Sequence, residues 1–205
     1  MKTKLERIVL GSILAPLAPL ALFMGCWWAA YSLLPEAWIF LGAVFGLGLG
    51  LFVDIFLLKK LIDRAGTLNN IFWAAIFLFY SVGFFGFFMG VPIFNLGLAI
   101  PAGFILAGRL VAEKTEETHV RATIRRTAGF TTIVLTFICS ASAIFALIDP
   151  YTEANLQGML GLPFNVTRGM VIGIIIVGGA SLLLLNWWLT SVSARFSYKF
   201  LQHNA

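Results

Sequence analysis

The longest apolar stretch of the chain runs from Ile71 to Gly108 without one charged residue. As a single helix rising 1.5 Å per residue, it would be about 57 Å long. The hydrocarbon core of a bilayer is only about 30 Å thick, so we expect two membrane spans here. The break belongs at Gly90-Val91-Pro92, because proline cannot continue a helix and restricts the residue before it.

The composition of the whole chain points the same way. Hydrophobic residues make up 60% of its 205 residues and charged residues only 11%, against about 25% charged in a soluble domain. This excludes a soluble globule and a disordered chain. The sequence predicts an all-α, polytopic membrane protein with one membrane-embedded helical domain over residues 1–205. The six expected spans cover about 8–34, 37–58, 70–89, 93–112, 127–148 and 169–194.

Prolines predict irregularities in two of these spans. Pro16 and Pro19 lie in the first half of the first span, where we expect a kink. Pro101 lies within the fourth span, where we expect a break. Corresponding broken helices in the two halves of a chain are typical of transport sites near the middle of the membrane.

The positions of the basic residues predict the orientation. All but one of the 14 Lys and Arg residues flank the expected spans on the same side, and Arg168 is the exception. By the positive-inside rule this predicts that both termini lie in the cytoplasm, and we expect a multi-pass protein of the cell (cytoplasmic) membrane. The same rule explains the net charge of +5, so no nucleic-acid partner is expected.

Two connecting segments are long enough to form structure. The outer segment 149–168 has an apolar, glycine-containing middle that we expect to dip toward the membrane or cap the bundle. The inner segment 109–128 lacks Gly and Pro, and Glu117 precedes Arg121 by one turn. We expect it to extend the fourth span into the cytoplasm or to form a short surface helix.

The motifs of common enzymes are absent from the sequence. There is no P-loop, no HExxH, no GxSxG and no Cys/His cluster with metal-ligand spacing. Cys26 and Cys139 are expected at different membrane depths, so we expect no disulfide between them. We expect no cofactor and no metal, and an enzyme is the least favoured class of function.

Asp54 is the only acidic residue within a confidently predicted span, five residues before Lys59. An ionised carboxylate inside a membrane is costly unless it is paired or hydrated, so such residues are functional candidates. Asp54 is a candidate for a cation or proton site, or for one member of a gate ion pair. The alternative is a residue that reaches the inner interface or pairs with Lys59, Lys60 or Arg109.

Asn95 is the second candidate, because it lies three residues after Pro92 in an interrupted helix. Such interruptions free carbonyl groups that can coordinate a ligand, and a neighbouring amide adds polar contacts. The alternative is an interhelical hydrogen bond. A further amide, Asn186, is expected at the inner interface beside two tryptophans. The candidates for a solute or ion pathway are Asp54, Tyr80, Pro92, Asn95, Pro101 and Ser140.

Stripes of small residues mark several spans. Without a β-carbon, glycines let helix backbones approach closely in a membrane. The neighbour is expected to be a helix of the same chain, a second copy of the chain, or another membrane protein. The glycines expected on such faces are Gly42, Gly46, Gly50, Gly86, Gly90 and Gly103.

Two functions follow from these features. The favoured one is a small-solute or ion transporter, or its membrane-embedded substrate-binding subunit. The alternative is an accessory or structural subunit of a larger membrane complex. A carrier should bring its polar candidates together, whereas a structural subunit should scatter them. A carried solute should be small and apolar or cationic, because the expected core has no Lys or Arg to neutralise an anion.

Overall fold

The computed structural model describes residues 4–203, which contain helices and no strand. Helix makes up 86% of the structure. Six helical segments are long and apolar enough to cross a membrane. This confirms the expected all-helical, multi-pass class, and it suits the chain to a lipid bilayer. The six segments are Lys4–Leu33, Glu36–Arg64, Asn70–Phe87, Pro92–Ala112, Glu117–Ile148 and Arg168–His203.

The chain forms two compact units, which meet in sequence between Phe72 and Trp73. The first unit contains the helices α1 (Lys4–Leu14), α2 (Leu17–Leu33) and α3 (Glu36–Arg64). Together α1 and α2 form the first span, and the helix is interrupted at Ala15-Pro16. Pro19 is the third residue of α2. The first N–H groups of a helix have no acceptor within the helix, so the N–H that proline lacks costs no helical hydrogen bond here.

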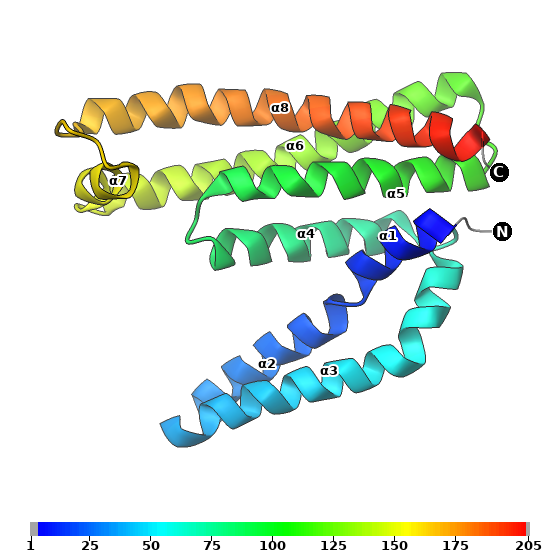
Figure 1. Cartoon of the computed structure of the whole chain (residues 1–205), viewed down its shortest axis with the longest axis horizontal. Coiled ribbons are helices and arrows are strands. Elements are labelled where there is room, and N and C mark those ends of the chain that lie inside the picture. Colours follow the sequence, from blue (N-terminus) through cyan, green and yellow to red (C-terminus); the bar gives the residue numbers. More distant parts are fainter. Residues whose placement is uncertain (1–3, 204–205) are drawn as a thin grey trace. The chain divides into compact units, whose positions relative to one another are not determined.

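Helices α2 and α3 form an antiparallel hairpin held by close backbone contact (Figure 1). A β-carbon added at Gly42 would lie 2.6 Å from Cβ of Ala30, and one at Gly46 would lie 2.7 Å from Cβ of Cys26. One added at Gly50 would meet the backbone of Pro19. Any side chain larger than hydrogen at these three positions would therefore push the two helices apart.

The second unit runs from Trp73 to His203. It contains most of α4 (Asn70–Phe87), the 3-10 helix η1 (Pro92–Leu98), and α5 (Ala99–Ala112), α6 (Glu117–Ile148), α7 (Thr152–Leu160) and α8 (Arg168–His203). Figure 1 shows α5, α6 and α8 side by side. Small residues let these three helices approach closely: Ala99, Ala107, Ala128 and Ala194 are completely buried.

The turn between α4 and η1 occurs where the sequence predicts the break. Met89 and Gly90 have positive φ angles of 53° and 80°, and the Gly90 N–H donates to the Phe85 carbonyl over 2.7 Å. Pro92 then opens η1. Pro101 lies in the first turn of α5, and the helix continues through it to Ala112; the change from 3-10 to α helix occurs before it, at Leu98–Ala99. The position of Pro101 spares α5 an interior proline.

The expectation for the inner segment 109–128 is wrong in one respect. The fourth span ends at Ala112, and residues from Glu117 onward extend the fifth span instead. The chain reverses at Lys114, where φ is 49° and the Thr115 N–H donates to the Leu110 carbonyl. The extension forms because Val120 and Ile124 pack in one apolar cluster with Leu110 and Ala194.

The connecting segment 149–168, for which we expected an outer location, forms α7 in its middle. None of the α7 residues is buried, so this helix is not part of a core. It ends at Gly161, which adopts the left-handed conformation at φ 59°. Glycine favours this conformation because it has no β-carbon.

Candidate functional site

Asn95 occupies the most unusual polar position in the second unit. Its side chain is only 5% exposed, and its Nδ2 donates to the Ser81 carbonyl oxygen of α4 over 2.9 Å. Its Oδ1 is buried and has no hydrogen-bond donor among the described residues. A buried acceptor without a donor costs about 1–3 kcal/mol. The amide nitrogen therefore joins η1 to α4, whereas the amide oxygen accepts no hydrogen bond from the described residues.

Aromatic rings hold the chain on both sides of the turn before Asn95. Phe88 and Phe94 stack with ring centroids 3.9 Å apart across this turn. Phe77 and Phe85 of α4 contact Phe130 and Phe145 of α6. Rigid aromatic contacts therefore fix the turn before Asn95 and the packing of α4 on α6.

The other buried polar groups of this unit form a helix-joining cluster. Asn186 of α8 donates through Nδ2 to the hydroxyl groups of Thr131 and Thr132 on α6, both over 3.2 Å. The Thr131 hydroxyl donates to the Ala128 carbonyl, so the Thr190 hydroxyl is the donor in their 3.1 Å contact. The cluster satisfies its members with one another and leaves little for a ligand.

Sequence reasoning missed this cluster. Asn186 was expected at the inner interface, yet it is only 1% exposed and lies between α6 and α8. The spacing held a signal, because Asn186 and Thr190 are one turn apart and share a helix face. The two threonines of α6 became partners only through the packing of that helix against α8.

Asp54 lies in the first unit, away from the other polar candidates in sequence. Its side chain is half-buried on α3. Within residues 4–72, no hydrogen bond or ion pair reaches its carboxylate, so neither Lys59 nor Lys60 pairs with it. It remains a candidate for a cation or proton site, separate from the Asn95 position.

The remaining pathway candidates occupy varied surroundings. Tyr80 is half-buried and contacts the rings of Phe79 and Phe84 edge-on. Ser140 is exposed on α6, and no hydrogen bond links it with Asn95 within the described residues. The structure thus brings Ser81, rather than Ser140, to the Asn95 amide.

The candidate glycines also differ in their surroundings. Gly42, Gly46 and Gly50 face α2 within the chain. A β-carbon at Gly103 would lie 2.7 Å from the Ala194 nitrogen of α8. Gly86 is exposed with nothing within 4 Å of such an atom, and Gly90 lies in the turn after α4 rather than on a helix face.

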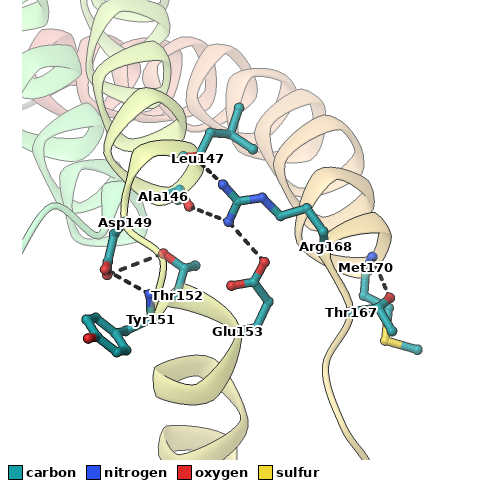
Figure 2. A network of polar contacts seen from close by, with 9 residues as sticks. All are labelled: Ala146, Leu147, Asp149, Tyr151, Thr152, Glu153, Thr167, Arg168 and Met170. Atoms are coloured by element: carbon teal, nitrogen blue, oxygen red, sulfur yellow. Dashed lines mark hydrogen bonds and ion pairs between the residues drawn. The ribbon is translucent and has the colours of Figure 1, made fainter.

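Arg168 organises the opposite end of the second unit (Figure 2). From the first turn of α8 its guanidinium donates to the Ala146 and Leu147 carbonyls at the end of α6. It also pairs with Glu153 of α7 over 3.0 Å. A cation is favourable at a helix C-terminus, where carbonyl groups lack internal partners. Arg168 therefore ties together α6, α7 and α8.

We expect Arg168→Gln to loosen the segment 150–167, because it removes the ion pair and the charged donor to α6. The cost should be about 1 kcal/mol, since the ion pair is partly exposed. Limited proteolysis of the purified protein should show faster cleavage in this segment. Glu153→Gln is the control, because it leaves the arginine on the α6 carbonyls and should have a smaller effect. Equal cleavage of the two variants would contradict the capping role.

Among the described residues, no group of three or more His, Cys, Asp or Glu residues is placed to hold a metal ion. Both cysteines are free thiols. In comparisons with known proteins, the chain matches no family model, no curated protein and no solved structure. Any functional assignment therefore depends on the geometry of the chain itself.

Proposed function

We propose that this protein binds a small solute within the membrane and carries it across, alone or as the substrate-binding subunit of a transporter. The observation that carries the proposal is the Asn95 amide, whose buried Oδ1 has no donor among the described residues. In this proposal Asn95 is the residue that contacts the solute.

The two ends of the Asn95 side chain support different roles. Nδ2 already makes the interhelical hydrogen bond that a purely structural amide would make, to the Ser81 carbonyl. A structural role leaves the buried Oδ1 unexplained, because most buried polar atoms in proteins have a partner. Asn186 differs in its surroundings, because its Nδ2 donates to two threonine hydroxyl groups within a polar cluster. The uncommitted oxygen is what a ligand contact requires.

The chemistry of that oxygen limits the solute. An amide oxygen accepts hydrogen bonds from N–H or O–H groups and coordinates cations, but it repels anions. Phe94 directly precedes Asn95 in η1, and its stacked partner Phe88 adds a further apolar surface nearby. The solute class is therefore a small, largely apolar molecule that carries a hydrogen-bond donor or a positive charge.

Asn95→Leu tests this proposal, because leucine is similar in size but has no polar atom. The full chain is purified gently from its membrane, and retained small molecules are measured by mass spectrometry. We expect the wild type to retain one solute and Asn95→Leu to retain at least tenfold less, as the loss of one good hydrogen bond implies. Thr136→Val is the matched control, since it removes an exposed hydroxyl group from the same unit that bonds only within its own helix.

Three outcomes of this experiment are informative. Equal retention by the wild type and by Asn95→Leu would contradict a solute contact at Asn95. Loss of retention in Asp54→Asn alone would move the site to the first unit. A stoichiometric protein partner without any solute would favour the alternative function, a structural subunit of a larger complex.

A further inference from the structure

The charges of the second unit are unbalanced at the end where α5 and α8 finish and α6 begins. This end holds three carboxylates, and each already contacts a basic side chain one turn away on its own stretch of chain. Glu113 pairs with Arg109 over 3.5 Å, Glu116 with His119 over 3.8 Å, and Glu117 with Arg121 over 3.7 Å. The other two carboxylates of this unit, Asp149 and Glu153, lie with α7 at the opposite end. No carboxylate is left for further cations.

Five basic residues remain at this end without an ion pair in the described part of the chain. All are exposed: Lys114, Arg125, Arg126, Arg195 and Lys199. Exposed cations at the end of membrane helices attract the phosphate groups of anionic lipids. The question is whether any of the five form a defined site rather than a diffuse positive surface.

Arg125 and Arg195 lie on the same side of the α6–α8 pair. The two helices are antiparallel, since Thr131 contacts Asn186 while Ile124 shares a cluster with Ala194. Each arginine directly follows one of these two cluster residues. In antiparallel helices, the residue after a contact residue turns toward the same side on both helices. Arg126, one position further along α6, points away from that side.

An indole ring marks the same side of the helix pair. Gly129 lies one turn after Arg125, and a β-carbon there would be 3.5 Å from the Trp187 ring. Trp187 is 40% exposed. The missing side chain at Gly129 thus makes room for the ring next to α6. Tryptophan at such a position is typical of the level of lipid headgroups.

The α8 surface beyond the arginines is apolar. Trp188 and Leu184 lie seven and eleven residues before Arg195, about two and three turns away, and so share its helix face. They are 57% and 74% exposed. An acyl chain can lie along these side chains while its phosphate meets the cations above, which a free phosphate ion cannot do.

From these placements we propose a binding site for an anionic phospholipid on the α6–α8 side defined by Arg125, Arg195 and Trp187. The two guanidinium groups bind the lipid phosphate, and guanidinium suits phosphate because it presents several donors in one plane. Trp187 lies at the glycerol level, and Trp188 and Leu184 contact an acyl chain. The site is independent of the solute site proposed at Asn95.

Native mass spectrometry of the full chain in detergent tests the site. The protein is titrated with dioleoyl-phosphatidylglycerol, with the zwitterionic dioleoyl-phosphatidylcholine, and with inorganic phosphate as a free anion. We expect at least tenfold tighter binding of the anionic lipid than of either other probe. The double variant Arg125→Gln/Arg195→Gln should weaken phosphatidylglycerol binding about 30-fold, from the usual contribution of two cations near an anionic surface.

Two matched double variants distinguish a defined site from diffuse charge. Lys114→Gln/Arg126→Gln removes the same net charge and should change phosphatidylglycerol affinity less than threefold. Arg125→Lys/Arg195→Lys keeps both charges and should remain within about fivefold of the wild type, which also shows that the positions tolerate substitution. Equal losses in both glutamine variants would overturn the proposal, as would equal affinity for the two lipids. Competition by inorganic phosphate at equal concentration would assign a free-anion site instead.

Discussion

Gly46→Val should separate α2 from α3 and strongly destabilise the first unit. A β-carbon at Gly46 would meet the Leu22 carbonyl oxygen, and it would lie 2.9 Å from the Leu22 carbonyl carbon. These are backbone atoms, so relief requires movement of the whole of α2. Overpacking commonly costs 1–3 kcal/mol, and we expect about 3 kcal/mol here because no side-chain rotation can relieve it.

Cys26 provides a direct readout of this change. Its Cβ would lie 2.7 Å from the new β-carbon, so the thiol lies in the contact that the substitution opens. We expect maleimide to label Cys26 several-fold faster in Gly46→Val, together with a lower unfolding temperature in detergent. Gly48→Val is the control on the same helix, because a β-carbon at Gly48 meets nothing within 4 Å. Similar labelling of both variants would show that α2 and α3 do not pack through Gly46.

Gly103→Val should have a comparable effect in the second unit. A β-carbon at Gly103 would lie 2.7 Å from the Ala194 nitrogen and 2.8 Å from the Thr190 carbonyl oxygen of α8. Displacing α8 would also disturb the Ser193 hydroxyl, which donates to the Ile100 carbonyl over 2.8 Å. We again expect about 3 kcal/mol, since both the packing and this interhelical bond are affected.

This prediction is tested by heating the purified protein and measuring its monodisperse peak by size-exclusion chromatography. The quantity compared is the temperature at which half of the peak is lost. Gly103→Val should lower the midpoint by several degrees. Gly83→Val is the control, because it places the same residue in a membrane helix where a β-carbon meets nothing within 4 Å. A midpoint for Gly103→Val within one degree of this control would contradict close packing of α5 on α8.

Several features of the fold were predictable from local sequence. Each span is long and apolar enough to be recognised without any knowledge of its neighbours. The interruption at Gly90-Val91-Pro92 was predictable for a similar reason, because proline restricts the backbone wherever it occurs. Asn95 was predictable as a candidate from its position after that interruption.

Other features depend on which helices meet. The helical extension within residues 109–128 belongs to α6 rather than α5 because Val120 and Ile124 pack against apolar residues of α5 and α8. Asn186 is buried because Thr131 and Thr132 face it from a helix more than 50 residues away. A hydropathy pattern shows that such residues are polar or apolar, but it does not name their partners.

Hydrophobicity and backbone restriction belong to individual residues and short segments, and they account for the helical class, the six spans and their breaks. Hydrogen bonding and close packing join residues far apart in the chain, so only the folded arrangement shows how they are satisfied. In the fold, the Arg168 guanidinium donates to carbonyl groups of α6, and the Asn186 amide donates to threonine hydroxyl groups. The same fold leaves one buried oxygen, Oδ1 of Asn95, without a donor in the described chain. That difference between satisfied and unsatisfied polar groups arises from tertiary contacts, because every amide in a sequence has the same hydrogen-bonding capacity.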